Sequence, residues 1–262
     1  MKTRGKYLIA KDYLVSSKEF KIIWNKEKQI AQTLIPDGID LSLYYNSENY
    51  HSHKNKSTSI KDRIYFFIQD LMFRFKKHLI KRYSTGGKLL DYGSGVGNFS
   101  KFMADNGFNV LAIEPDKGAM KTSIRKTVNT VSGLEMLIDK EDFNTITLWH
   151  VLEHIPDPES YLNQMFKLLK KNGIISIALP SDPGILWRLG RYFLKIIKVK
   201  KILNISNEEY DYMIATEHIN SIFNLISIIK YKYKKNIVSE NYLPFKIKSL
   251  DLNLFYNVTL KK

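Results

Sequence analysis

The chain has 262 residues and 44% of them are hydrophobic, which is enough for one large domain or for a domain with an appendage. It contains no cysteine, and this excludes disulfide bonds, thiolate zinc sites and every mechanism that needs a cysteine nucleophile. The formal net charge of +15 favours anionic partners, namely nucleic acid, a membrane surface, or a phosphorylated or sugar-nucleotide substrate.

The N-terminal part of the chain is expected to be an extension rather than part of the main domain. It has no apolar core of signal-peptide length, and the chain has no run of about 18 uncharged apolar residues, so we expect a cytoplasmic protein without a membrane span. Peripheral contact with the inner membrane surface is kept as an alternative. Residues 1–56 are polar and turn-rich, and their run LSLYYNSENYHSH includes Tyr44 and Tyr45, which are candidates for closing a substrate site.

The rest of the chain has a regular alternation of elements. A helix is predicted over 57–83, because apolar residues recur there at spacings of three, four and seven. Further predicted elements are strands over 88–92, 109–113, 145–150 and 173–179 and helices over 98–106, 117–126 and 158–171. This alternation indicates a parallel sheet covered by helices on both faces. It ends after residue 181, and a last helix over 221–229 and two strands within 236–262 are predicted.

Three glycines stand at alternate positions in LLDYGSGVGNFS, residues 89–100. Gly93, Gly95 and Gly97 follow a predicted strand and precede a predicted helix, where glycine lets a ligand approach the backbone closely. The start of that helix offers unpaired N–H groups and a partial positive charge. The third glycine comes one residue earlier than in the dinucleotide pattern Gly-x-Gly-x-x-Gly, so the motif alone is compatible with a nucleotide site or with a tight turn.

Two further strand ends carry polar side chains. Glu114 ends the second strand, in NVLAIEPD, where a carboxylate can accept both hydroxyls of a ribose. His150 ends the strand in FNTITLWHVLEHIPDP, at the edge where open α/β sheets bind ligands. Glu153 and His154 then begin a turn that two prolines close.

In this order and at this spacing, the three segments resemble a class I S-adenosylmethionine-dependent methyltransferase of the small-molecule type. The resemblance covers about residues 86–182 and, loosely, 217–260. It implies a doubly wound, mostly parallel seven-stranded α/β sheet with an antiparallel C-terminal strand and helices on both faces. It implies S-adenosylmethionine as the cofactor, and we predict no metal ligands. The implied cofactor contacts are Asp91, Gly93, Ser94, Gly95 and Gly97 for the methionine part, Glu114 with Pro115 for the ribose, Leu134 for the adenine, and His150 to His154 beside the methyl group.

The chain departs from this family in two places. Asn144 follows Phe143 where the family often has aspartate, at a position that is mostly structural. Relatives with a similar N-terminal half often carry a small cysteine-ligated zinc module. Residues 1–56 are therefore interpreted as a remnant of such a module without its metal or as a different fold, and the methyltransferase domain is predicted over 57–262.

A basic insert is predicted over 183–216, where this family places segments that cover the substrate. Its run GILWRLGRYFLKIIKVKKILNI has six basic residues and no acidic residue among large apolar side chains. Three interpretations stay open: an ordinary lid with a solvated basic face, an amphipathic segment that reaches a lipid-linked substrate at a membrane surface, or a site where Arg188 and Arg191 recognise phosphate or a sugar acid.

Methyl transfer is an in-line displacement, for which positioning matters most and a general base is needed only in some cases. His150 and His218 are the candidate bases. The leading hypothesis is an enzyme that methylates oxygen or nitrogen of a small-molecule, sugar or lipid-linked acceptor. The alternatives are a non-catalytic cofactor-binding subunit, a nucleic-acid methyltransferase and, more remotely, an NAD oxidoreductase. The missing cysteine and the run Trp-His-Val-Leu after the fourth strand argue against two kinds of nucleic-acid methyltransferase.

Overall fold

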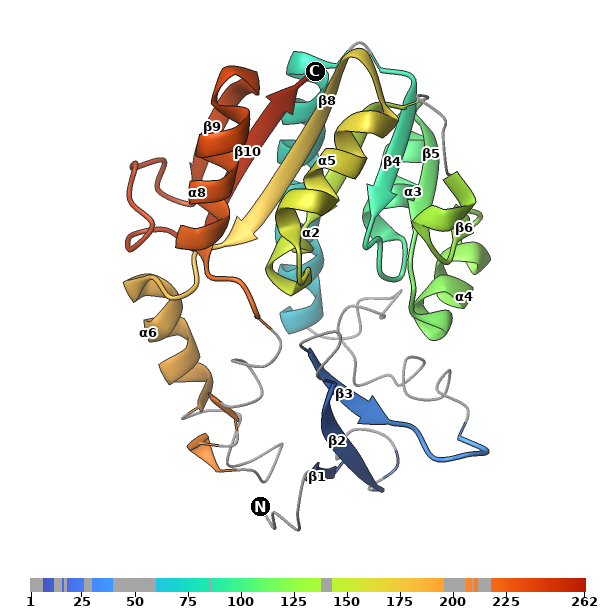
Figure 1. Ribbon diagram of the computed structural model, residues 1–262, viewed down its shortest axis with the longest axis vertical. Helices are drawn as coiled ribbons and strands as arrows, with labels where there is room; N and C mark the ends of the chain where they lie inside the picture. Colours follow the sequence, from blue (N-terminus) through green and yellow to red (C-terminus); the bar gives the residue numbers. More distant parts are fainter. Residues whose placement is uncertain are drawn as a thin grey trace.

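The computed structural model describes residues 7–11, 16, 18–25, 30–39, 60–84, 86–137, 143–195, 206–208, 210–211 and 218–262. Most of them belong to a large sheet flanked by helices, and a small N-terminal sheet lies beyond one end of it (Figure 1).

The large sheet has seven strands in the order β6-β5-β4-β7-β8-β10-β9. The first five are parallel, whereas β10 pairs antiparallel with both β8 and β9. This arrangement confirms the predicted fold class. The strands are β4 (Lys88–Tyr92), β5 (Asn109–Ile113), β6 (Asn129–Val131), β7 (Phe143–Trp149), β8 (Leu169–Pro180), β9 (Ile237–Leu243) and β10 (Phe255–Lys261).

Helices cover both faces of this sheet, and each face has its own apolar cluster. One cluster joins the sheet to α5 and α8 through side chains such as Met165 and Leu225, and the other joins it to α2 and α3 through Ile80 and Met103. The central strands are apolar along their length because both of their faces are buried. The helices are α2 (Ile60–Tyr83), α3 (Asn98–Asp105), α4 (Lys117–Arg125), α5 (Pro158–Leu168) and α8 (Ile222–Tyr233).

Three segments differ from the predicted elements, and the first is β6, which was not among the predicted strands. The helix predicted over 158–171 ends at Leu168, and β8 begins at once with an irregular, exposed start in which Asn172 has a φ of 65°. Residues 185–194 form a helix, α6 (Ile185–Leu194), within the predicted insert. The backbone N–H groups of Ile185 and Leu186 donate to Asp251, so a distant residue satisfies the start of this helix. None of the described helices combines the length and apolarity needed to cross a bilayer.

The N-terminal residues contain strands that the sequence analysis missed. β1 (Tyr7–Lys11), β2 (Glu19–Asn25) and β3 (Ile30–Leu34) form an antiparallel three-stranded sheet in the order β1-β2-β3. These strands are short and carry lysine, glutamate and glutamine between their apolar residues. Their composition is therefore polar enough that no strand was predicted there. The interpretation of this part as a remnant of a zinc module stays a prediction, and Tyr44 and Tyr45 lie outside the described residues.

Candidate functional site

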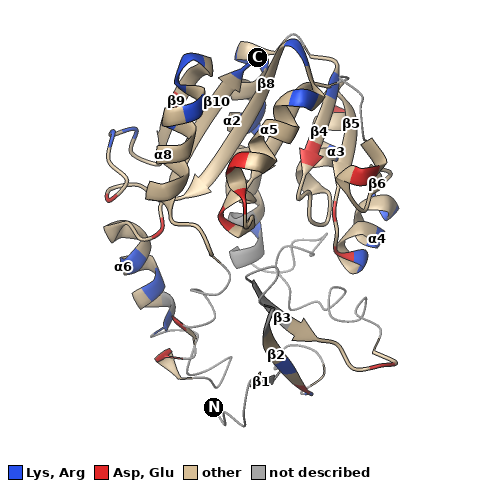
Figure 2. Cartoon of the chain, viewed as in Figure 1, with Lys and Arg blue, Asp and Glu red and all other residues tan. Residues whose placement is uncertain are grey.

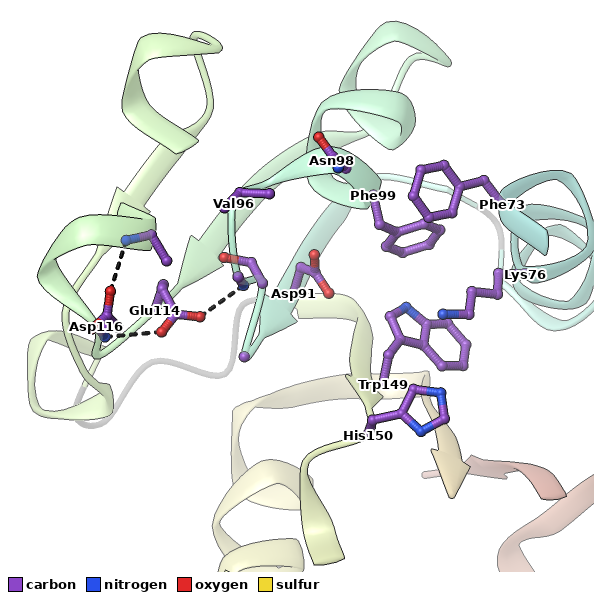
Figure 3. A pocket seen from close by; sticks show the side chains of 14 residues that line it. Phe73, Lys76, Asp91, Val96, Asn98, Phe99, Glu114, Asp116, Trp149 and His150 are labelled. Atoms are coloured by element: carbon purple, nitrogen blue, oxygen red, sulfur yellow. Dashed lines mark hydrogen bonds between the residues drawn. The ribbon is translucent and has the colours of Figure 1, made fainter. Parts of the chain in front are cut away.

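A cavity of about 440 Å³ lies at the carboxyl ends of β4, β5 and β7 (Figure 3). The parallel strands bring the predicted side chains together at this edge, as expected for an open α/β sheet. Phe73 and Lys76 from α2, Phe99 from α3 and Trp149 from β7 line the cavity without having been predicted. The predicted residues that line it are Asp91, Gly93, Ser94, Gly95, Glu114 and His150.

The glycine turn follows β4, and its three glycines have different surroundings. All three have a positive φ, 70° at Gly93, 56° at Gly95 and 75° at Gly97, a conformation that other residues rarely adopt. A Cβ atom on Gly93 would lie 2.6 Å from Cγ2 of Val151, and one on Gly97 would overlap with Ser123. A Cβ atom on Gly95 would meet no atom within 4 Å. The packing of the protein thus requires two of the glycines, while the third leaves open space in the cavity.

Glu114 follows β5 and faces Gly95 (Figure 3). Its Oε2 accepts a hydrogen bond from the Gly95 N–H at 2.7 Å, and its Oε1 accepts one from the Asp116 N–H at 2.9 Å. Burial raises the pKa of Glu114, and the two hydrogen bonds oppose this rise. A carboxylate has about four lone-pair sites, so both oxygens retain acceptor capacity toward a ligand.

Asp91 lies near the end of β4 and is only 2% exposed. Its oxygens accept hydrogen bonds from the hydroxyl of Ser100 at 2.5 Å and from the hydroxyl of Thr147 at 2.7 Å. Burial raises the pKa of Asp91, whereas the two hydroxyls and the charge of Lys76 lower it. Asp91 is thus a hydrogen-bond acceptor whose position in the cavity wall is fixed by its neighbours.

Lys76 reaches the cavity from α2. Its ammonium nitrogen lies 4.5 Å from the ring centroid of Trp149 and 5.6 Å from that of Phe99. Burial lowers the pKa of Lys76 to about 8, and the charge of Asp91 opposes this change. Within the part of the chain that the structure describes, this ammonium has no hydrogen bond and no ion pair. A cation held by aromatic rings and without an anionic partner is suited to bind an anionic group of a ligand.

His150, the first predicted base, follows β7 at the edge of the cavity. Its φ of 59° is unusual for this residue type, and its N–H donates to the carbonyl of Ala178 at 2.9 Å. The imidazole packs edge-on against the ring of Phe255, with 5.2 Å between the centroids. Its Nδ1 lies 3.7 Å from Oε1 of Glu153, a buried carboxylate that is 2% exposed. The predicted base therefore lies at the cavity and beside a buried acid.

His218, the second predicted base, comes shortly before α8. Its Nδ1 lies 3.1 Å from Oδ2 of Asp182, and the Nη2 of Arg191 donates to Oδ1 of Asp182 at 2.9 Å. Burial alone would raise the pKa of Asp182, but the hydrogen bond to His218 and the charge of Arg191 outweigh it and hold this pKa below its usual value. The ring of His218 is 5.2 Å from that of His154, so the second predicted base lies beside the turn η3 (Leu152–His154) that follows the first.

Comparison with known proteins decides the family. A methyltransferase domain family matches residues 67–231, which is more than half of the chain. The chain belongs to this methyltransferase family. The ubiquinone biosynthesis O-methyltransferase of Pelagibacter ubique is 32% identical to it over 123 residues, which are 44% of this chain and 51% of that protein. The demethylmenaquinone methyltransferase of Corynebacterium urealyticum is 23% identical over 164 residues, 60% of this chain and 71% of that protein. The chain spans about half the length of most curated relatives that it matches.

Solved structures have the same fold as this chain. A SAM-dependent methyltransferase from Archaeoglobus fulgidus has a TM-score of 0.54 at 16% identity, covering 76% of this chain and 99% of that chain. The plantazolicin methyltransferase BpumL in complex with SAH has a TM-score of 0.51 at 14% identity, covering 78% and 91%. At such identities the likeness concerns the fold. It confirms the predicted class I architecture of S-adenosylmethionine-dependent methyltransferases.

The cavity of this chain fits S-adenosylmethionine, the cofactor of the family. The hydroxyl oxygen of Ser94 is buried and has no hydrogen-bond partner among the described residues, and Gly95 opens onto empty space. Glu114 retains acceptor capacity that suits a ribose diol. Lys76 offers a cation to the carboxylate of the methionine part. Ser94 thus lacks a partner among the described residues, and Gly95, Glu114 and Lys76 keep space or bonding capacity that is complementary to parts of the cofactor.

Six of the predicted residues that the structure describes do not line this cavity, and two of them, His218 and Arg191, meet at Asp182 instead. Gly97 packs against Ser123, and Pro115 is exposed after Glu114. Leu134 starts η2 (Leu134–Leu137) and packs, half-buried, against the apolar cluster. Arg188 is exposed on α6. The roles assigned to these residues stay predictions.

Among the residues of the site that the sequence analysis did not predict, Lys76 and Asp182 carried a signal in the sequence. Lys76 lies three residues after Phe73 and four before Ile80, so the helical period places a lysine on the apolar face of α2. Asp182 follows the end of β8 at the same edge of the sheet as Glu114 and His150. Glu153 was covered only by the range His150 to His154 and given no role of its own, because nothing local distinguishes it from an exposed glutamate.

Proposed function

We propose that this chain transfers a methyl group from S-adenosylmethionine to an oxygen or nitrogen atom of a small-molecule acceptor, with a lipid-linked hydroxyl compound as the first choice. The observation that carries the proposal is the asymmetry of the cavity. Glu114 lies beside Gly95 at one end of the cavity, and Lys76 lies beside Trp149 at the other end, where His150 stands with the buried Glu153 behind it (Figure 3).

The cofactor side is proposed to act by binding and orientation. When bound, the cofactor supplies an electrophilic methyl group on a sulfonium centre. Glu114 accepts the ribose hydroxyls with the lone pairs that Gly95 and Asp116 do not use. Lys76 pairs with the carboxylate of the methionine part, and Asp91 accepts from its ammonium. Gly95 lets this part lie against the backbone, because no side chain fills the space above it.

The acceptor side is proposed to take up a proton. A hydroxyl acceptor must lose its proton during transfer, and an imidazole with a carboxylate next to it is suited to accept that proton. His150 lies at the cavity itself, 3.7 Å from Glu153. His218 is oriented by Asp182, and this hydrogen bond places the proton on Nδ1 and the lone pair on Nε2. Holding the acceptor in line with the methyl group supplies the rest of the rate enhancement.

A lipid-linked acceptor is favoured by the surface of α6. This helix lies at the same end of the sheet as the cavity (Figure 1), and its Arg191 is bonded to Asp182. Apolar side chains beside basic ones are typical of segments that lie at a membrane interface. Two relatives are named for ubiquinone and menaquinone chemistry, which is compatible with such an acceptor. The exposed apolar side chains of α6 are Ile185, Leu189, Tyr192 and Phe193.

The distribution of charge favours a small molecule over a nucleic acid. Figure 2 shows basic residues at the end of the sheet opposite the cavity and along α6, and acidic residues around the carboxyl ends of the central strands. A polyanionic acceptor would need basic groups around the cavity, because phosphate contacts supply most of the affinity for nucleic acids.

The proposal is tested in two steps with the full chain. Thermal stability is first measured with S-adenosylmethionine or NAD, since a ligand at 100 times its dissociation constant adds about 2.7 kcal/mol. Transfer from the labelled cofactor is then measured across lipid, sugar and nucleic-acid fractions. We expect stabilisation by S-adenosylmethionine and label in the lipid fraction. Stabilisation by NAD alone, or label in nucleic acid alone, would contradict the proposal.

A further inference from the structure

A second polar cluster adjoins the acceptor side of the cavity. Glu153 and His154 belong to the turn η3 after β7, and His218 precedes α8. One potential ligand atom from each of the three residues lies within 4.8 Å of the other two. Segments far apart in the sequence are therefore brought to the spacing that a metal ion requires.

The buried carboxylate of Glu153 is the strongest indication of a bound cation. Its side chain is 2% exposed, and Oε2 has no hydrogen-bond partner among the described residues. Among the described residues, the charged partners of Oε1 are distant, with Nδ1 of His150 at 3.7 Å and Nε2 of His154 at 3.9 Å. A buried carboxylate without hydrogen bonds is costly unless it is paired or coordinates a metal.

His218 is oriented in the way that metal-bound histidines usually are. Its Nδ1 lies 3.1 Å from Asp182, and Arg191 in turn holds that carboxylate. A histidine that binds a metal through one nitrogen commonly donates from the other to a carboxylate, which fixes the tautomer and strengthens the ligand. Asp182 and Arg191 are thus arranged as the outer partners of a ligand.

We infer that Glu153, His154 and His218 bind a divalent transition-metal cation. Two imidazoles and one carboxylate form a ligand set that zinc, iron and related cations accept, and it leaves coordination positions open for water or for an acceptor oxygen. This departs from the absence of metal ligands predicted from the sequence. No cysteine is needed, because the charge of the site comes from a buried glutamate.

The place of the cluster gives the cation a role in methyl transfer. Glu153 lies between His154 and His150, and His150 lines the cavity. A cation here would bind an acceptor hydroxyl and favour its ionised form. His218 then serves as a ligand, and His150 remains as the proton acceptor. This role rests on the proposed function, whereas the binding of the cation does not.

The test is a titration of the chelator-treated, untagged full chain with Co²⁺, followed by calorimetry and by the visible absorption of the bound ion. One equivalent should bind. Glu153→Gln and His218→Gln should each weaken binding tenfold or more, and Asp182→Asn, which removes an outer partner, should weaken it roughly 10–100-fold. His78→Gln on the exposed face of α2 is the matched control and should change nothing. The double variant His51→Gln/His53→Gln excludes binding by the other pair of histidines in the chain.

The outcomes separate the two inferences. Failure of the parent to bind Co²⁺, or unchanged binding in Glu153→Gln and His218→Gln, would overturn the metal site, and melting curves verify that each variant is folded. The Co²⁺ titration needs neither cofactor nor acceptor, so its result does not depend on the proposed function. If Co²⁺ binds as expected and methyl transfer is the same before and after chelation, the site is supported and its role in transfer is overturned.

Discussion

The two sides of the cavity are assembled in different ways. The cofactor side comes mostly from residues 91–116, one continuous segment that runs from the end of β4 through the glycine turn and β5. The acceptor side comes from residues 150–154, from 182–191 and from His218, which meet only when β7, β8 and α8 are packed. The same edge of one sheet thus carries a site made by local sequence and a site made by long-range packing.

This difference separates the effects that substitutions should have. On the cofactor side the bonds join neighbouring backbone groups to one carboxylate, as in the pair of Gly95 and Glu114. On the acceptor side the bonds join side chains from distant segments, as in the pair of Asp182 and His218. Changes on the first side should alter cofactor affinity, and changes on the second side should alter turnover at unchanged cofactor affinity.

The largest effect is expected from Gly95→Val, which should abolish detectable binding of S-adenosylmethionine. The new side chain would occupy the open space above the turn, where we place the methionine part, and it would strain a backbone with a φ of 56°. Calorimetry on the folded variant measures its affinity for S-adenosylmethionine. Gly93→Ala is the contrasting change, since its Cβ would meet Val151 at 2.6 Å and should lower the melting temperature. Near-parental affinity in folded Gly95→Val would remove the turn from the site.

Glu114→Ala should weaken the cofactor about a hundredfold, because two charge-assisted hydrogen bonds worth roughly 1.5–3 kcal/mol each are lost. Glu114→Gln should fall between the parent and Glu114→Ala, since its amide keeps one acceptor oxygen. The dissociation constants follow from calorimetry. Equal affinity of the alanine variant and the parent would show that Glu114 only ties Gly95 and Asp116 together.

Lys76→Met should weaken the cofactor about tenfold, through the loss of one charge-assisted hydrogen bond of roughly 1.5 kcal/mol. It should also raise the free energy of unfolding without cofactor. Burial holds the pKa of Lys76 at about 8 in the folded chain, below the usual 10.5, so its charged form is disfavoured there. The increase in the free energy of unfolding should be largest below pH 8, at roughly 3 kcal/mol at most. It should vanish as the pH rises toward 10.5, because Lys76 of the parent is then neutral in both the folded and the unfolded chain.

Denaturant titrations of the parent and of Lys76→Met from pH 7 to about 10.5 measure this difference in the free energy of unfolding. The combination of higher stability with weaker cofactor binding is the mark of a residue retained for function. A Lys76→Met variant that is less stable and binds the cofactor normally would assign Lys76 to packing against Trp149 alone.

The smallest effect is expected from Arg188→Glu on α6. It should weaken binding to anionic vesicles by about 1 kcal/mol for each positive charge removed near the surface, and leave cofactor affinity unchanged. Arg191→Gln should instead lower turnover, because it takes away the partner of Asp182. Vesicle sedimentation and transfer rates distinguish the two. If the two variants changed vesicle binding and transfer rate in the same way, Arg188 and Arg191 would not have separate roles in surface binding and in support of the site.

The sequence by itself determined the sheet and the cofactor side. The strands over 88–92 and 109–113 were predicted with their observed bounds. Each is a short apolar block that glycine or polar residues flank on both sides. The glycine turn and Glu114 could also be placed, because a strand end and the residue after it are close in sequence and in space. Family, fold class and the predicted cofactor all rest on these local signals.

Only the tertiary structure decided the rest. The start of α6 is satisfied by Asp251, Lys76 meets the rings of Trp149 and Phe99, and Asp182 meets His218. Each of these contacts joins segments from different parts of the chain, so no periodicity or spacing within one segment encodes it. The contacts follow from the register of β8 with β7 and β10 and from the packing of α2 and α8. The sequence could therefore nominate His150, His218 and Arg191 one by one, but not their meeting with Asp182 and Glu153.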